Sequence, residues 1–276
     1  MSLGETLLIT GGGGSVARMV RPHLREAGLK LRLLDRNPIA DAGEDEQDVC
    51  DLADQDGLRA AMSGCIAVLH LAGCTTDAPW EDQIAGNVAG CIGLFEAARA
   101  TRVERVIYAS SNHVVGMHPR NRRLTVAAPF RPDSRYGVTK AFGELLGAFF
   151  ADKYALRVLC IRIGSAEPQP VDRRRLSIWL SPRDLAQLVT IGVRKPDLRY
   201  AVVYGVSDNA RSFYDASESD RLGYKPLDRA EDYAAAILER DPYPPIGAAL
   251  SPGEFAQGGS FVEGEFVGRP DRLSEW

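Results

Sequence analysis

TLLITGGGGSVA, residues 6–17, joins a short apolar, β-prone run to four glycines and then to the start of an amphipathic pattern. Apolar residues then recur at helical spacing until Gly28, so we predict a strand, a glycine turn and a helix. Glycines in this position let the backbone approach a pyrophosphate and direct amide groups and the helix N-terminus at it. The spacing therefore predicts a dinucleotide site, with an ordinary flexible turn as the weaker alternative. The residues expected to contact the dinucleotide in this turn are Gly11, Gly14, Ser15 and Val16.

The second predicted strand, LRLLD at residues 31–35, ends in an acid. Asp35 lies roughly 20 residues beyond the glycine turn, where a carboxylate can bind the ribose hydroxyls of the adenosine. This acid favours NAD over NADP, although the adjacent Arg36 could pair with the additional phosphate of NADP. The alternative for Asp35 is a turn-opening aspartate ahead of Asn37-Pro38.

Strand-like and helix-like patterns alternate along the first half of the chain. We expect strands at 66–71, 105–110 and 157–163, and helices from Asp54 to Met62, from 81 to 101, and from Tyr136 to Tyr154. Residues 41–48 resemble a solvated acidic loop, and residues 49–52 a brief extended piece. The alternation predicts an α/β fold with a doubly wound, Rossmann-type parallel sheet.

The pattern changes after Gly164, with several prolines, three consecutive arginines, a helix at 185–193 and a strand at 200–204. We therefore expect residues 1–165 to form an NAD-binding core. Residues 166–276 would form a small substrate-binding lobe, interleaved with the core as one compact unit.

A second constellation is Tyr136-Gly137-Val138-Thr139-Lys140. Residues four apart share a helix face, so the phenol and the ammonium would lie together. A free phenol has a pKa of about 10, and a neighbouring ammonium favours the phenolate and lowers that pKa. The pair could then take a proton from a substrate hydroxyl. A solvated Tyr–Lys pair is the alternative, and the upstream glycine turn and strand-end serines argue against it.

Composition limits the partners. The 276 residues carry a formal net charge of −4, with 45% hydrophobic and 25% charged residues, an ordinary globular mixture. We therefore expect neither nucleic acid nor a membrane as partner. Five scattered cysteines without a CxxC pair predict reduced thiols in a cytoplasmic protein, and no metal site.

These motifs occur in the order found in extended short-chain dehydrogenases/reductases, the NAD-dependent epimerase/dehydratase superfamily, which the chain resembles. Further matching segments are Asp51-Leu52, His70-Leu71-Ala72-Gly73, Asn87 and Leu222–Pro226. Within this superfamily the chain is similar to uronate dehydrogenases, through Ser110–His113, Arg162–Ser165, Arg174–Trp179 and Gln257–Val262.

The resemblance implies NAD-dependent oxidation of the anomeric carbon of a hexuronate, glucuronate or galacturonate, to the aldarolactone. Tyr136 would remove the hydroxyl proton, and Lys140 would lower the Tyr136 pKa and hold the nicotinamide ribose. Ser111 would hydrogen-bond the reacting oxygen; its spacing from Gly116 matches the catalytic serine of related enzymes better than that of Ser110. The nicotinamide accepts the hydride, so no metal is needed.

The resemblance also assigns further contacts. A guanidinium can hold the uronate carboxylate bidentately, which is the role expected of Arg174, although three arginines in a row are usually solvated. Thr75 stands where a serine is expected, and Met117-His118 replaces an aromatic pair and could alter the sugar preference. A homo-oligomer is expected through the helices that carry Tyr136 and Asn87. The expected cofactor contacts also include Asp51, Leu52, Leu71, Ala72, Gly73, Asn87, Tyr136, Lys140 and Ile163; the expected substrate contacts are Thr75, Ser111, Asn112, His113, Tyr136, Ser165 and Arg174.

Two alternatives stay open. A nucleotide-sugar epimerase or dehydratase of the same fold usually has a larger C-terminal lobe than this chain can supply. A non-catalytic dinucleotide sensor often lacks the tyrosine or the lysine, and both are present here.

Overall fold

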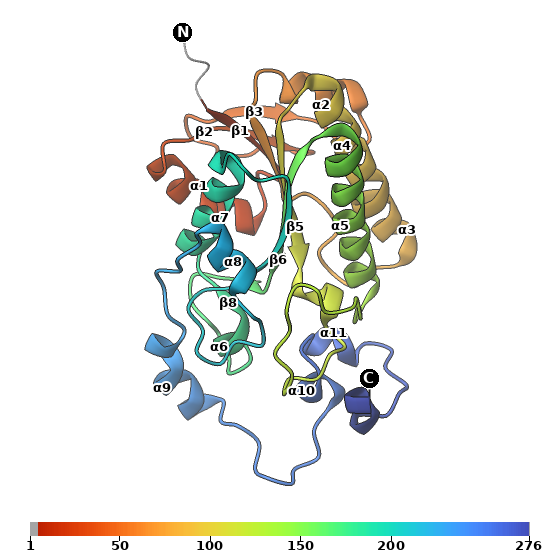
Figure 1. Ribbon diagram of the computed structural model, residues 1–276, viewed down its shortest axis with the longest axis vertical. Coiled ribbons are helices and arrows are strands. Elements are labelled where there is room, and N and C mark those ends of the chain that lie inside the picture. Colours follow the sequence, from red (N-terminus) through yellow and green to blue (C-terminus); the bar gives the residue numbers. More distant parts are fainter. Residues whose placement is uncertain (1–4, 276) are drawn as a thin grey trace.

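The computed structural model describes residues 5–275, which fold around one seven-stranded parallel sheet. The strand order is β3-β2-β1-β4-β5-β6-β9, with helices on both faces (Figure 1). The strands are β1 (Thr6–Thr10), β2 (Lys30–Asp35), β3 (Glu46–Val49), β4 (Ala67–His70), β5 (Arg105–Ser111), β6 (Arg157–Ile163) and β9 (Tyr200–Gly205). The predicted doubly wound fold is confirmed.

The helices form two layers around the sheet. One face is covered by α1 (Ser15–Glu26), α7 (Pro182–Arg194) and α8 (Ser217–Leu222), and the other by α2 (Gln55–Met62), α4 (Gly90–Thr101) and α5 (Arg135–Tyr154) (Figure 1). Because successive side chains of a strand point to opposite faces, β1 contributes to both cores. Leu7 and Ile9 pack on the α1–α7 side and Leu8 on the α2–α4 side, all fully buried.

Short elements gather beyond the carboxyl ends of β5 and β6, at the bottom of Figure 1. They include a two-stranded parallel ladder of β7 (Ser165–Ala166) and β8 (Trp179–Leu180). The helices here are η2 (Asn112–Val115), α6 (Arg175–Ile178), α9 (Glu231–Arg240), α10 (Pro252–Phe255), α11 (Ser260–Glu263) and η3 (Pro270–Glu275). Since this is the end of a parallel sheet where ligands bind, the site is expected between the strands and these elements.

One local prediction is wrong and another is refined. The strand next to β2 is Glu46–Val49, so it starts inside the predicted acidic loop 41–48 and contains only the first residue of the extended piece predicted at 49–52. An edge strand of polar residues has no apolar face that would reveal it. The helix expected at 81–101 is divided into α3 (Trp80–Gln83), a π-helical turn η1 (Ile84–Ala89) and α4.

Candidate active site

The glycine turn brings the backbone against a neighbouring strand end. Gly11 has φ of +69°, and a Cβ on it would lie 2.8 Å from the amide nitrogen of Ala72. The amide of Gly14 donates to the Gly11 carbonyl at 2.9 Å, and α1 starts at Ser15 without a capping side chain. Gly14 and Ser15 are exposed and Val16 is half-buried. An uncapped helix N-terminus beside exposed backbone suits a pyrophosphate.

Asp35 ends β2 at the mouth of this turn. Its Oδ2 accepts a hydrogen bond from the Gly13 amide at 3.1 Å, while its Oδ1 accepts one from the Asn37 amide at 3.3 Å. The carboxylate thus opens the following turn, as the alternative interpretation expected, and also faces the glycine turn. Asp35 is half-buried and Arg36 is exposed beside it.

Ser111, Tyr136 and Lys140 come together from β5 and α5. The Lys140 ammonium donates to the Ala109 carbonyl at 2.8 Å and lies 5.6 Å from the centre of the Tyr136 ring. Hydrogen bonding from the Ser111 hydroxyl lowers the pKa of the Tyr136 phenol. All three side chains are at most 9% exposed. The three residues predicted to be catalytic therefore form one buried group.

The protonation of this group differs from expectation. Burial raises the pKa of Tyr136 to about 12, and the Ser111 hydroxyl only partly opposes that rise. Burial lowers the pKa of Lys140 to about 8, so its ammonium predominates at neutral pH. The predicted lowering of the Tyr136 pKa is therefore wrong for this structure, because desolvation dominates and Asp133 and Cys74 raise the pKa further. The phenolate needs a further positive charge near the ring.

The choice between the two serines follows from their partners. The Ser110 hydroxyl donates to Glu144 Oε1 at 2.5 Å, and both Glu144 oxygens accept from the Arg162 guanidinium at 2.9 Å. These three side chains are at most 2% exposed. Ser110 therefore belongs to a buried network behind the sheet end, whereas Ser111 faces Tyr136.

His113 is held by two residues that sequence reasoning missed. Its Nδ1 lies 2.7 Å from Oδ2 of Asp133, whose side chain is fully buried. The imidazole stacks on Phe261 with ring centres 4.0 Å apart and lies 5.8 Å from the Tyr136 ring. Asp133 resembled an ordinary turn residue, and Phe261 only another aromatic residue of the C-terminal segment. The match at Gln257–Val262 was the available signal.

Arg174 is not a solvated arginine. Its Nε and Nη2 donate to the Gln257 carbonyl at 3.0 and 2.7 Å, and a Cβ on Gly259 would lie 2.6 Å from its Nε. Burial lowers the Arg174 pKa to about 10, so the guanidinium stays charged at neutral pH. The two arginines next to it in the sequence have acidic partners. Arg173 pairs with Asp241 and Glu254, and Arg175 pairs with Asp172.

The remaining predicted residues lie around the carboxyl edge of the sheet. Asn87 is buried in η1 and exchanges hydrogen bonds of 2.8 Å with the backbone of Cys74, so it fixes the loop after β4. Asp51 accepts from the Ala53 amide at 2.9 Å. Asn112 is fully buried, and Ser165 starts β7. The exposed residues are Asp51, Gly73 and Thr75; the half-buried ones are Leu52, Leu71, Ala72, His113, Ile163, Ser165 and Arg174.

Residues 5–275 contain neither a metal-binding cluster nor a membrane-spanning helix. No group of three or more His, Cys, Asp or Glu side chains in this range could hold a metal ion. None of the helices described is both long and apolar enough to cross a membrane.

The fold and this site define a dinucleotide-dependent enzyme of the short-chain dehydrogenase/reductase type. The model of the NAD dependent epimerase/dehydratase family matches residues 7–178, and the chain belongs to this family.

Within the family, the predicted resemblance to uronate dehydrogenases is confirmed. Uronate dehydrogenase of Pseudomonas syringae pv. tomato is 40% identical over 258 residues, which are 93% of this chain and 92% of the relative. The crystal structure of uronate dehydrogenase from Agrobacterium tumefaciens superposes with a TM-score of 0.87 at 39% identity, covering 94% and 97% of the two chains. A mutant of that enzyme was crystallised with NAD. NAD-dependent glucose-6-phosphate dehydrogenase of Haloferax volcanii is 35% identical, over 83% of this chain and 95% of its own.

Proposed function

We propose that this enzyme oxidises the anomeric carbon of a cyclic hexuronate, glucuronate or galacturonate, to the aldarolactone with NAD. One observation carries the proposal: a single short C-terminal segment contacts both a positively charged side chain and the proposed base. Gln257 holds Arg174, and Phe261, four residues later, packs against His113 and Tyr136. A site for a sugar acid needs this combination, a positive charge for the carboxylate and a proton acceptor for the hydroxyl.

The chain's residues fit NAD. The backbone at Gly11, Gly14, Ser15 and Val16 would hold the pyrophosphate, and Asp35 would hold the adenosine ribose. The remaining cofactor contacts line the strand ends, at Asp51, Leu52, Leu71, Ala72, Gly73, Asn87 and Ile163. NAD, when bound, accepts the hydride and brings a positive ring charge that favours the Tyr136 phenolate.

Tyr136 then takes the proton of the anomeric hydroxyl, and Ser111 donates a hydrogen bond that fixes the same oxygen. Lys140 stays charged beside the ring and holds the nicotinamide ribose. Because Lys140 also donates to Ala109, its position is fixed before any ligand arrives.

Arg174 pairs with the uronate carboxylate. The Gln257 carbonyl occupies two of its donors, which sets the direction of the rest of the guanidinium. His113, oriented by Asp133, contacts the sugar together with Asn112, Thr75 and Ser165. Phe261 covers the apolar side of the imidazole.

We further propose that residues 1–165 hold NAD and that residues 166–276 cover the substrate while also completing the core. The position of β9 at the edge of the main sheet supports this interleaving. The enzyme works in the cytoplasm as a homo-oligomer. Free cysteines and the exposed apolar residues Ile84, Ile92, Leu145 and Phe149 on adjacent helices support these two assignments.

The test is NADH formation with glucuronate and with galacturonate. NADP, glucose and glucose 6-phosphate serve as controls for the cofactor, the charge and the kind of anion. Turnover should require NAD and a hexuronate. Faster turnover of glucose 6-phosphate than of either uronate would replace the proposal with a sugar-phosphate dehydrogenase.

A further inference from the structure

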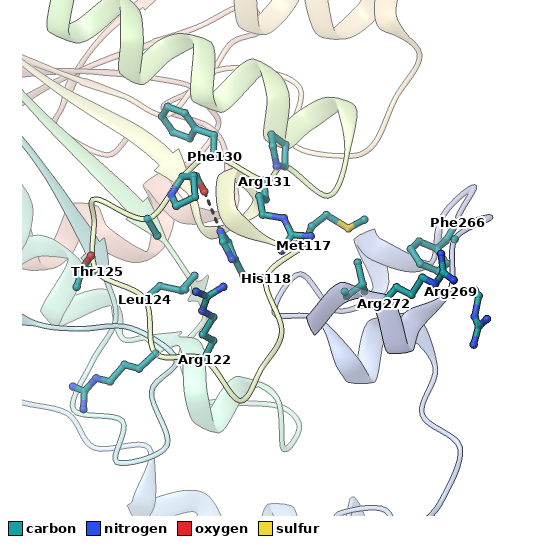
Figure 2. A pocket seen from close by; sticks show the side chains of 16 residues that line it. Met117, His118, Arg122, Leu124, Thr125, Phe130, Arg131, Phe266, Arg269 and Arg272 are labelled. Carbon is teal, nitrogen blue, oxygen red and sulfur yellow. Dashed lines mark hydrogen bonds between the residues drawn. The ribbon is translucent and has the colours of Figure 1, made fainter. Parts of the chain in front are cut away.

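The molecule contains a cavity of about 930 Å³ outside the catalytic group. Residues 117–132, which follow the catalytic strand, form one wall, and residues 266–273 of the C-terminal segment form the other (Figure 2). Ser111, Tyr136, Lys140 and Arg174 are not among its lining residues. The Gln257 amide donates to the His118 carbonyl at 2.9 Å, so the C-terminal segment is joined to the first wall at a lining residue.

The cavity is rich in arginine. Five arginines line it, and none of its lining residues whose side chains the structure describes is acidic: Arg122, Arg123, Arg131, Arg269 and Arg272. Burial lowers the pKa of Arg131, and the nearby Arg122 lowers it further. Burial and these same two arginines lower the pKa of His118, so this imidazole is neutral at pH 7. Arg122 and Arg131 therefore lie close to each other and to His118 on the same wall.

The rest of the lining is apolar. Met117, Leu124, Phe130, Phe266 and Leu273 contribute side chains, drawn from both walls. In Figure 2 the arginines lie on both sides of this apolar lining, Arg122 and Arg131 on the loop and Arg269 and Arg272 on the C-terminal segment. A concave apolar surface with a few charged groups is the usual form of a small-molecule site.

We propose that this cavity binds an organic anion with an apolar body, at a site separate from the hexuronate site. The arginines take the carboxylate, sulfonate or phosphate group, since a guanidinium binds all three through paired hydrogen bonds. The apolar side chains take the body of the ligand. Neither inorganic phosphate nor a neutral apolar molecule would use both features.

The probe is anilinonaphthalene sulfonate, whose fluorescence rises in an apolar site. It is titrated into the full chain alone, with saturating NAD, and separately with saturating galacturonate, so that no turnover occurs during the titration. Phenylnaphthylamine, which lacks the sulfonate, and inorganic phosphate test the two features separately. The variant is Arg272→Glu, with Arg272→Gln as a milder form, because Arg272 is exposed at the cavity rim. Arg199→Glu, at an exposed arginine just before β9 and outside the lining, is the matched control.

We expect one sulfonate-dye site that persists with NAD bound and also with galacturonate bound. Arg272→Glu should weaken it by about tenfold and Arg272→Gln by less, with turnover and melting temperature unchanged. Arg199→Glu should bind the dye like the parent. Equal dye affinity in all variants, tight binding of the uncharged dye, or displacement by NAD or galacturonate would each overturn the proposal. Because turnover is measured separately, a failed hexuronate assay does not affect this result.

Discussion

At the scale of single residues, the site depends on a phenol that is hard to ionise. Replacing Tyr136 by Phe keeps the ring that faces His113 and removes only the acid–base group. We expect turnover to fall by about 10²- to 10⁴-fold, the usual contribution of a positioned base. NADH affinity, measured by fluorescence titration, should stay within about twofold. Retained turnover would remove Tyr136 from its assigned role.

Lys140 links catalysis to stability. Its pKa is about 8 in the folded chain and 10.5 ordinarily, so the unfolded chain binds more protons between these pH values. Stability therefore rises with pH from 8 to 10.5, and below pH 8 the buried ammonium costs about 3 kcal/mol.

Lys140→Met should therefore raise the free energy of unfolding at pH 7 by about 1–3 kcal/mol, less than the full cost because the Ala109 carbonyl loses its donor. The gain should shrink at pH 10, and turnover should be lost. Urea titrations at the two pH values measure this; a gain that is equal at both would contradict the shifted pKa.

The three consecutive arginines provide an internal control for carboxylate binding. Arg174→Ala removes the guanidinium held by Gln257 and should raise the KM for hexuronate by about 10- to 100-fold with little change in kcat. Arg175→Ala removes only a guanidinium paired with Asp172. Its KM should match that of the parent enzyme. Equal KM values for both variants would place Arg174 outside the substrate site.

At the scale of elements, the sequence predicted most of the strands and helices that carry the proposed site residues. The strand–turn–helix units, the Tyr136–Lys140 helix and the strand-end serines are local patterns, so the sequence alone can indicate them. β3 was missed because its alternation is polar, and η1 because a π-helical turn leaves no composition signal. Asp133 and Phe261 were missed because they lie 20 and 148 positions from His113 in the sequence. They meet its imidazole only in the folded chain.

At Gly258 the C-terminal segment comes so close to Asp133 that there is no room for a side chain. A Cβ on Gly258 would lie 1.9 Å from Oδ2 of the buried Asp133. Gly258→Ala should therefore lower stability by about 1–3 kcal/mol and raise the KM for hexuronate, because Asp133 must move away from His113. Gly264→Ala is the control, since its Cβ would meet nothing closer than 3.9 Å. Thermal melts and initial rates measure both effects, and identical behaviour of the two variants would contradict the prediction.

At the scale of the whole molecule, one apolar surface is left uncovered. Leu145 and Phe149 of α5 are 61% and 46% exposed, next to Ile84 and Ile92 of the neighbouring helices at 51% and 41%. Leu145→Lys should convert the proposed homo-oligomer to smaller species by placing a charge in this surface. Light scattering after gel filtration measures the mass. Ile246→Lys, at a fully exposed residue between α9 and α10, should leave it unchanged.

The hydrogen bonds from Arg174 to Gln257 join two parts of the chain that could be separated by a cut. In the sequence between these two residues lies an exposed connection, residues 245–250, which crosses the bottom of Figure 1 between α9 and α10. A chain cut there would leave the NAD site and the base in one fragment and Gln257 and Phe261 in the other. The two halves would regain uronate oxidation only on reassembly, so the enzyme could serve as a split reporter of proximity between two fused proteins.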